Sequence, residues 1–354
     1  MSVGDHQAVA VMPAEWEMHR AVWVAWPEGE ELWGGHLSGA REEWLGLCRA
    51  IAAPYDSRNG REEVIEVLVR DPQAAAVVTE ALAGASVTVH VVPYGDVWLR
   101  DTAPLFCRGV DGARVAVRFE FNGWGEKYVF ADDPELAARL AEHLGVELVE
   151  AGVVLEGGAL EVDGEGTLIT TVDCALNSNR NPRADAAAIE SALERTLGVR
   201  TTLWLHGRLA RDHTDGHVDT LARFAAPGRV LCMVASDSRD PNREVLRSLR
   251  AQLSAGVDAA GRRLEVVEIP SPGRVDDDDG LPLPASYLNY YISNAAVVVP
   301  VYGSEYDSAA VDALASCFAD RPVIAAPARH ILTGGGAFHC VTQQEPLMTE
   351  DRST

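Results

Sequence analysis

The stretch VIEVLVRDPQAAAVVTEALAGASVTVHVV, residues 64–92, shows the pattern that organises the chain. Its two ends, 64–69 and 86–92, are rich in β-branched residues, which predicts strands. Between them, Asp71 is a good N-cap and Pro72 a good first residue for an alanine-rich helix. A strand–helix–strand unit of this kind indicates a mixed α/β protein.

The same alternation of short strands and helices continues through the chain. Asp-Gly turns at 111–112 and 163–164 lie between apolar runs and predict hairpins. The acidic segment VDDDDG, 275–280, is expected to be a solvated loop between strands near 264–269 and 287–292. Further helices are predicted to begin near Asp133, Arg183, Pro241 and Glu305.

Composition limits the function. The chain has 354 residues and a net charge of −23. Binding of nucleic acid needs clustered lysines and arginines that contact phosphates, so it is not expected here, whereas a cationic small molecule suits such a surface. The acidity could also serve solubility alone. No 18-residue apolar run and no basic, apolar N-terminal segment occur, so we expect neither membrane insertion nor secretion, and a cytoplasmic location.

The cysteines are widely spaced and form no C-x-x-C pair, which argues against a disulfide framework or a zinc cluster. We therefore expect reduced thiols, one of which is reactive. They lie at positions 48, 107, 174, 232, 317 and 340.

The segment ILTGGGAFHCVTQQ, 331–344, is the best candidate for a nucleophile. Three consecutive glycines suit a place where the backbone approaches another group closely. Cys340 follows them in polar surroundings, which is less typical of a cysteine that only fills a core.

The segment RDHTDGHVDTLARF, 211–224, offers an acid/base pair. Its alternation after Gly216 predicts a strand, on which His217 and Asp219 would point to the same face. A polar edge strand without a role is the plain alternative. His213 and His217, four residues apart, would share a face on a helix and suggest a metal hydrolase, although no third ligand has suitable spacing.

Two further segments add carboxylates. In DVWLRDTAPLF, 96–106, Trp98 and Asp101 are placed in a loop between strands, where an indole beside a carboxylate could hold a cation. In VVLEGGALEV, 153–162, Glu156 ends an apolar strand and could orient a histidine. An ordinary surface ion pair and an ordinary strand end are the alternatives.

Taken together and in order, six motifs resemble the agmatine deiminase/bacterial peptidylarginine deiminase-like family. The resemblance extends from about residue 12 to about 346. The motifs are WLRDTAP, LEGGALEVDGEGT, LNSNRNP, HTDGHVDT, LPASYLNYYISNAAVVVP and GGGAFHCVTQQEP.

The resemblance implies a pentein fold, a five-bladed α/β propeller of strand–strand–helix–strand units around a central active site. It also implies one catalytic domain, 1–346, followed by a short tail, 347–354. The catalytic residues implied are Cys340, His217, Glu156, Asp101 and Asp219. Asp101 and Asp219 would also bind the substrate, together with Trp98, Trp124, Gly335 and Gly336.

The implied reaction converts a guanidino group to a ureido group with release of ammonia. Asp101 and Asp219 would grip the planar cation, whose N–H donors match carboxylates. Cys340 would attack its central carbon to give an S-alkyl thiouronium. His217, oriented by Glu156, would protonate the leaving ammonia and then activate water. No cofactor and no metal are expected.

The substrate is less well defined than the reaction. Agmatine, giving N-carbamoylputrescine, is the first expectation; arginine, a peptide arginine or a specialised metabolite are alternatives, and Arg118 and Arg180 could then bind a carboxylate. Ala103 and Glu126 stand where the family usually has glycine.

A binding protein without activity on the same fold is a further alternative, since fold does not fix function. The expected partner is a small cationic guanidino compound, with no nucleic acid and no membrane. Whether the chain forms a homo-oligomer is left open by the sequence.

Overall fold

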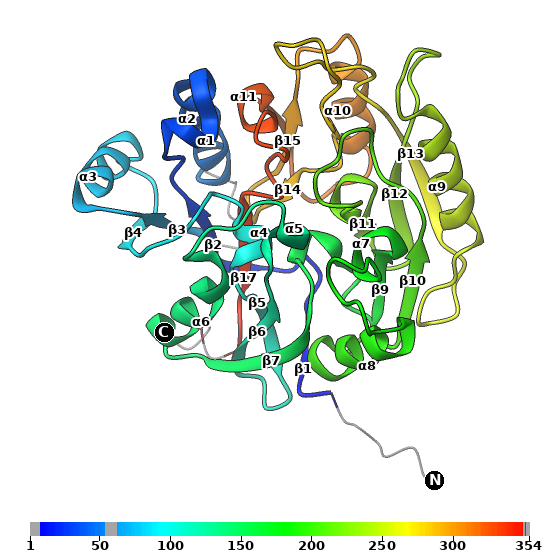
Figure 1. The fold of residues 1–354 in the computed structure, drawn as a ribbon, viewed down its shortest axis with the longest axis horizontal. Coiled ribbons are helices and arrows are strands. Elements are labelled where there is room, and N and C mark those ends of the chain that lie inside the picture. Colours follow the sequence, from blue (N-terminus) through cyan, green and yellow to red (C-terminus); the bar gives the residue numbers. More distant parts are fainter. Residues whose placement is uncertain (1–7, 54–61, 350, 352–354) are drawn as a thin grey trace.

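A computed structural model of the chain describes residues 8–53, 62–349 and 351. Within this part the protein is a mixed α/β structure in which five separate sheets carry the strands. The long helices lie around the outside and the short helices α4 and α5 lie nearer the middle (Figure 1). No helix of the described residues is both long and apolar enough to cross a membrane.

The predicted unit at residues 64–92 is confirmed. Strands β3 (Val64–Val69) and β4 (Val87–Val91) pair in parallel, and α3 (Pro72–Ala81) connects them. The Asp71 side chain caps this helix by accepting a hydrogen bond from the Ala74 N–H at 2.8 Å. Parallel neighbours require a crossover of this kind, so the local sequence already specified the topology.

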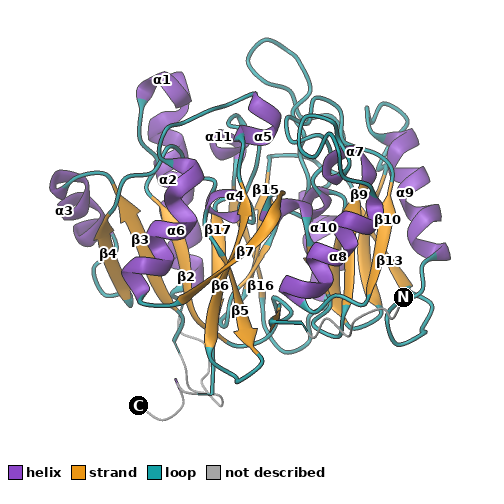
Figure 2. Cartoon of the chain, turned by 60° about the horizontal axis from the view of Figure 1, so that its bottom comes forward, coloured by secondary structure: helices purple, strands orange, loops and turns teal. Residues whose placement is uncertain are grey.

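Each sheet has three or four strands (Figure 2). The first, in the order β17-β2-β3-β4, adds β2 (His19–Ala25) and β17 (Thr342–Pro346) to the pair above. The second contains β1 (Ala10–Val11), β5 (Leu105–Gly109), β6 (Arg114–Glu120) and β7 (Glu147–Val154). The third contains β10 (Thr201–Leu205), β9 (Thr167–Thr171) and β8 (Glu161–Val162).

The fourth and fifth sheets each combine an antiparallel and a parallel pair. The fourth contains β11 (Ala222–Ala226), β12 (Arg229–Val234) and β13 (Glu265–Pro270). The fifth contains β14 (Tyr291–Ile292), β15 (Val297–Val301) and β16 (Val323–Pro327). The predicted strand near 287–292 is therefore shorter than expected. Both predicted Asp-Gly hairpins are confirmed, as β5–β6 and β8–β9.

The predicted helices are present with small shifts of their first residues. The longer ones are α2 (Leu37–Ile51), α6 (Asp133–Leu144), α8 (Ala186–Leu197), α9 (Arg243–Ala255) and α10 (Asp307–Ala315). The short α-helices are α1 (Glu30–Trp33), α4 (Leu99–Thr102), α5 (Gly123–Glu126), α7 (Val172–Ala175) and α11 (Arg329–Leu332). The 3-10 turns are η1 (Gly34–His36), η2 (Gly157–Ala159) and η3 (Val218–Thr220).

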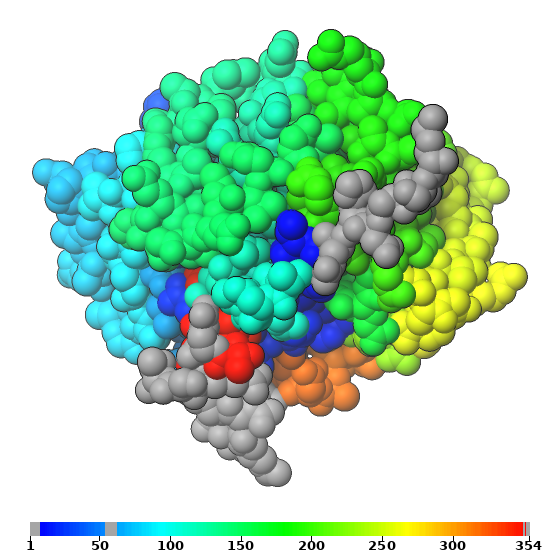
Figure 3. Space-filling view, turned by 90° about the horizontal axis from the view of Figure 1, so that it is seen from below, coloured from blue at the N-terminus to red at the C-terminus, as the bar shows by residue number. Residues whose placement is uncertain are grey.

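Strands near both ends of the described chain are built into the sheets. Strand β17 pairs with β2, and β1 pairs with β5, in both cases antiparallel. Seen from below, the red C-terminal segment lies beside blue N-terminal residues and the β5–β6 hairpin (Figure 3). The predicted tail, 347–354, lies partly outside the described residues. Leu347 N–H donates to Met18 carbonyl at 2.8 Å, and Asp351 forms an ion pair with Arg114 at 2.5 Å.

Candidate active site

A cavity of about 350 Å³ collects side chains from distant segments. Its buried end is formed by Trp98, Asp101, Trp124, Gly336 and Cys340; the four residues other than the glycine are at most 8% exposed. Its open end is formed by Glu31, Asp96, Tyr128, Phe130 and His213. Among the described residues, no lysine or arginine lines this cavity. A second cleft of about 480 Å³, lined by residues such as Arg239 and Tyr306, contains none of the predicted site residues.

Cys340 lies in the turn that precedes β17, and one side chain fixes this turn. Asn289 Oδ1 accepts from the Ala337 N–H at 3.0 Å and from the Cys340 N–H at 3.3 Å. The Asn289 amide nitrogen also donates to the Cys340 sulfur at 3.1 Å. One buried amide thus positions both the backbone and the thiol.

The glycine run before Cys340 makes close contacts, as predicted. A Cβ at Gly336 would come within 2.8 Å of both the Cys340 sulfur and the Trp98 ring. A Cβ at Gly334 would come within 2.6 Å of the same ring, and Gly335 has φ 107°. These glycines therefore leave space for Trp98 and the sulfur at the same place.

The surroundings of Cys340 disfavour a free thiolate. Burial, together with the negative charges of Asp219 and Asp101, raises the pKa of the Cys340 thiol well above its usual value. The sulfur is 3.5 Å from Asp219 Oδ2. A cation bound between the two aspartates would counter both charges and lower the pKa of the thiol.

Asp101 belongs to the short helix α4, not to a loop as predicted. Its Oδ1 accepts from the Gly158 N–H at 2.9 Å, and its Oδ2 accepts from the Trp124 indole N–H at 2.9 Å. Trp124 has the left-handed φ of 54°, which is costly for a bulky residue. Its hydrogen bond to Asp101 gives this strained backbone a role in the site.

His217 and Asp219 do not lie on a strand, which corrects the prediction. Asp215 and Gly216 have φ values of 68° and 100°, and η3 follows directly. Left-handed residues interrupt extended backbone, so the strand β11 begins only at Ala222. The two side chains consequently have different partners, although both are buried.

His217 faces two carboxylates. Its Nδ1 is 3.8 Å from Asp101 Oδ1, and its Nε2 is 3.6 Å from Glu156 Oε2. Neither ring nitrogen has a hydrogen-bond partner among the described residues. Burial alone would lower the pKa of His217, but the charges of Asp101 and Glu156 and the Cys174 thiol raise it well above the usual value. The ring is therefore an imidazolium near neutral pH.

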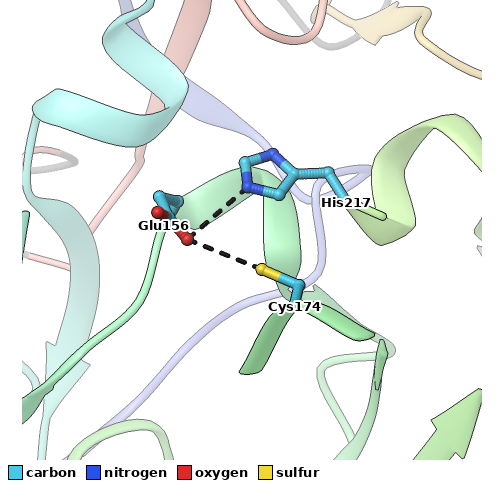
Figure 4. Close-up of side chains that lie close together, drawn as sticks. All are labelled: Glu156, Cys174 and His217. Carbon is cyan, nitrogen blue, oxygen red and sulfur yellow. Dashed lines mark hydrogen bonds and ion pairs between the residues drawn. The ribbon is translucent and has the colours of Figure 1, made fainter. Parts of the chain in front are cut away.

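Glu156 is fully buried and is held by the guanidinium of Arg180, whose Nε donates to Oε1 at 2.7 Å. The Cys174 thiol donates to Oε2 at 3.7 Å, so this oxygen lies between the thiol and His217 (Figure 4). Burial raises the pKa of Glu156, but His217 and Arg180 outweigh it and lower the pKa. Glu156 is therefore ionised and favours a protonated His217.

Asp219 presents one occupied and one open oxygen. His339 Nδ1 donates to Oδ2 at 2.8 Å, whereas Oδ1 has no hydrogen-bond partner among the described residues. Burial raises the pKa of Asp219, but the hydrogen bond and charge of His339 outweigh it and lower the pKa. An ionised carboxylate with a free oxygen beside a thiol is suited to a cationic N–H donor.

A metal site is a poor fit to these residues. Among the described residues, Glu156, Cys174 and His217 are the one group whose ligand atoms lie within 4.8 Å of one another. The Arg180 cation already binds Glu156, and it would repel a metal ion there. His213 is not in this group; it contacts the Tyr128 hydroxyl at 3.1 Å. The proposed pairing of His213 with His217 is thus not formed.

Neither arginine suggested for a substrate carboxylate is available. Arg180 is occupied by Glu156 and Asp215, each at 2.7 Å. Arg118 pairs with Glu135 and Glu150 at 3.3 Å and does not line the cavity. Sequence alone does not show which anion an arginine meets, so these assignments were wrong.

The two departures from the family pattern have opposite outcomes. Ala103 has φ −79° and ψ 161°, an extended backbone that any residue adopts, so no glycine is needed. Glu126 has φ 65°, a left-handed value that favours glycine. The first substitution is therefore tolerated without strain and the second is not.

Sequence reasoning gave no role to several residues of the site. Asn289 lies in a motif that was recognised only as a whole, and Cys174 was treated as one thiol among six. His339 lies in the motif that contains Cys340, and the motif predicts no partner for it. Their contacts join segments far apart in the chain, so no local pattern reveals them.

Comparisons with known proteins show the family of the chain. The sequence model of the Porphyromonas-type peptidyl-arginine deiminase family matches residues 11–346. An agmatine deiminase from Stutzerimonas stutzeri is 36% identical over 361 residues, covering 95% of each chain. The solved agmatine deiminase of Enterococcus faecalis is 31% identical, with a TM-score of 0.87 and 98% of each chain covered.

A more distant structure, DDAH from Pseudomonas aeruginosa, shares the fold at 12% identity, with a TM-score of 0.51 and coverage of 92% and 99%. The family model matches most of the chain, and the relatives match it over nearly their full length. The chain belongs to the Porphyromonas-type peptidyl-arginine deiminase family.

Proposed function

We propose that the protein is an agmatine deiminase that hydrolyses agmatine to N-carbamoylputrescine and ammonia through a covalent adduct on Cys340. One observation carries this proposal: the Cys340 thiol and the Asp101 carboxyl line the buried end of a cavity that has acids, and among the described residues no lysine or arginine, along its wall, and the buried Asp219 carboxyl lies 3.5 Å from the same sulfur. The agmatine deiminases among its relatives support the same class of reaction, hydrolysis of a C–N bond in an amidine.

The guanidinium is bound by the aspartates. It is planar, and its N–H donors point outwards in its plane. Asp101, which lines the cavity, accepts from one edge, and the unpartnered Oδ1 of Asp219, a buried carboxylate beside the Cys340 sulfur, accepts from another. Trp98 and Trp124, whose rings line the same end, offer apolar faces to the cation. Gly335 and Gly336 keep this space open.

The chemistry then needs only side chains. The bound cation lowers the pKa of the thiol, the proton leaves to solvent, and the Cys340 sulfur attacks the central carbon. His217 donates its proton to the leaving nitrogen, the C–N bond breaks, and ammonia departs from an S-alkyl thiouronium. The neutral His217 next takes a proton from water, the hydroxide adds to the carbon, and the C–S bond breaks. As the C–S bond breaks, the O–H proton of the adduct passes to solvent, so that the neutral ureido product is released. His217 is left protonated, and the Cys340 thiolate regains a proton from solvent.

Two buried thiols lie near this chemistry, and we assign the nucleophile to Cys340. Cys340 lines the cavity beside Asp101, whereas Cys174 is 0% exposed and does not line it. Cys174 instead donates to Glu156, and its pKa is raised to about 11 by burial and by that carboxylate. A thiol without access to the substrate is a structural group at this site.

The open end supports agmatine over arginine. Agmatine ends in an ammonium group, and Glu31 and Asp96 are the anions that line this end. Arginine and peptide arginine carry a carboxylate or a backbone that would meet these acids without a cationic partner. Ammonia release measured with agmatine, arginine and an arginine peptide tests this assignment. We expect kcat/KM for agmatine to exceed the others by at least about 100-fold; a preference for arginine or the peptide would overturn it.

A specialised guanidino metabolite remains the second candidate substrate, because half of the open end is apolar and neutral. Tyr128, Phe130 and His213 line it, and burial lowers the pKa of His213. An inactive binding protein is disfavoured, since all five predicted catalytic residues are present in the chain. The same ammonia-release assay with guanidino metabolites that carry bulkier amine tails distinguishes agmatine from a specialised metabolite as the substrate, and no ammonia from any compound would indicate an inactive protein.

We also propose that the five sheets are the blades of a pentein propeller around this cavity. The number of sheets and the likeness to the solved deiminase support it. The division into a domain, 1–346, and a tail, 347–354, and a cytoplasmic location stay predictions. Limited proteolysis followed by activity assays tests the division: removal of the tail should leave turnover intact.

A further inference from the structure

His339 directly precedes Cys340, yet it does not line the cavity; its ring lies in a buried charged cluster. The side chain is almost fully buried, and its backbone is fixed on both sides. The His339 N–H donates to the Asn289 carbonyl at 3.0 Å, and Arg100 Nε donates to the His339 carbonyl at 3.3 Å. The position of this ring is therefore set by the same turn that positions the thiol.

The ring bridges two carboxylates. Its Nδ1 is 2.8 Å from Asp219 Oδ2, and its Nε2 is 2.8 Å from Glu15 Oε2. Burial would raise the pKa of both carboxyls, but His339 lowers the pKa of Asp219, and Arg223 together with His339 lowers that of Glu15. Ionised carboxylates only accept hydrogen bonds, so the ring needs an N–H on both nitrogens. It satisfies both partners as an imidazolium.

The two carboxylates that His339 bridges, Glu15 and Asp219, differ in their other hydrogen-bond partners. Glu15 Oε2 also accepts from Arg223 at 2.8 Å, and its Oε1 accepts from the Ile292 N–H at 2.9 Å. Asp219 Oδ2 has, besides His339, only the Cys340 thiol at 3.5 Å among the described residues. Glu15 would stay in place without His339, whereas Asp219 would lose its fixed orientation.

We propose that His339 is a positioning residue for the reaction: it orients Asp219 so that Oδ1 faces the guanidinium, and its charge offsets the negative charge beside the Cys340 sulfur. This inference rests on the proposed function for its first half, whereas the second half concerns the thiol alone. The charged groups around the ring are Asp219 and Glu15, which it contacts, together with Arg100, Arg223 and the Glu161 that pairs with Arg223.

Two variants separate the two nitrogens. His339→Asn places an amide N–H near the Nδ1 position, towards Asp219, and His339→Gln places one near the Nε2 position, towards Glu15. We expect KM for agmatine to rise by at least about tenfold in H339Q but to stay within about threefold in H339N, the scale of one charge-assisted hydrogen bond. His206→Asn, at an exposed histidine, is the matched control and should change neither.

The charge effect is measured without substrate. Both H339N and H339Q remove the imidazolium, so the midpoint of Cys340 alkylation by iodoacetamide should move up by about one pH unit. Thermal unfolding checks that the variants are folded. Equal losses in H339N and H339Q that follow a fall in Tm, with an unmoved alkylation midpoint, would overturn the inference. If the wild-type protein does not turn over agmatine but the midpoint still moves, the proposed function fails and the effect on the thiol stands.

Discussion

The two ends of the cavity are built on different principles. At the buried end and in the buried cluster next to it, the side-chain atoms of Asp101, Glu156 and His339 are joined by short contacts to partners from other segments. At the open end, Glu31 and Tyr128 are exposed and Asp96 is half-buried. A fixed, dry arrangement is suited to chemistry, and a partly hydrated one is suited to substrate choice. We therefore expect substitutions of the reacting groups Cys340 and His217 to change kcat and those at the open end to change KM.

The largest effect is expected for the nucleophile. Cys340→Ala should lower kcat by at least about 10⁴-fold, because no other group at the buried end can form the covalent intermediate. Cys174→Ala should keep most of the turnover, since this thiol donates to Glu156 without lining the cavity. Steady-state ammonia release measures both. Inactivation of Cys174→Ala with normal activity in Cys340→Ala would reverse the assignment.

His217→Gln is expected to lower kcat by about 10²–10⁴-fold, the usual contribution of a general acid and base. The wild-type pH profile should follow from the two raised pKa values. Activity rises with pH as the Cys340 thiol ionises, and it falls again once His217 loses its proton. The fall in activity on the alkaline side of the profile, which reflects deprotonation of His217, should be absent in H217Q. An unchanged profile in the variant would remove His217 from the proton transfers.

At the open end, Asp96→Asn should raise KM for agmatine by about tenfold while leaving kcat nearly unchanged. Burial raises the pKa of Asp96 to about 6, so the carboxyl loses its charge as the pH falls below that value. KM for agmatine should therefore rise on acidification in the wild type and stay flat in D96N. Butylguanidine, which lacks the ammonium group, is the matched substrate and should respond to neither change. A similar rise with butylguanidine would show a general loss of the cavity.

The smallest effect concerns backbone strain beside the open end. Glu126 is exposed and has φ 65°, so Glu126→Gly should stabilise the protein by up to about 1 kcal/mol. The substitution removes the cost of a left-handed backbone at a residue with a side chain, and the greater conformational entropy of glycine in the unfolded chain offsets part of this gain. Glu142→Gly, at an exposed position within α6, should instead destabilise it by about 1 kcal/mol. Denaturant unfolding compares the two. Equal destabilisation would mean that the left-handed backbone at 126 costs nothing.

Local patterns predicted the elements well and their junctions less well. The unit at 64–92 has its cap, its first-turn proline and its β-branched ends within one segment, so the sequence specifies it. His217 and Asp219 were placed on one strand face because the letters after Gly216 alternate. The left-handed residues Asp215 and Gly216 and the turn η3 override that alternation.

The site was predictable to the extent that its residues carry motifs. Cys340 and Asp101 lie at the same buried end of one cavity, as the resemblance implies. The motifs do not predict which charged side chains pair with one another in the folded site. Arg180 binds Glu156 instead of a substrate carboxylate, and His339 binds Asp219 and Glu15. Such pairs depend on folding, because the sequence positions of the partners are far apart.

The central claim is that the Cys340 sulfur, and not that of Cys174, bonds to the substrate carbon. Acid quenching during turnover of agmatine, followed by tryptic digestion and mass spectrometry, tests it directly. Cys340 lies in the tryptic peptide 330–352 and Cys174 in the peptide 140–180. We predict an added mass of agmatine less ammonia on the first peptide. The same mass on the second peptide, or turnover with no adduct on either, would contradict the account.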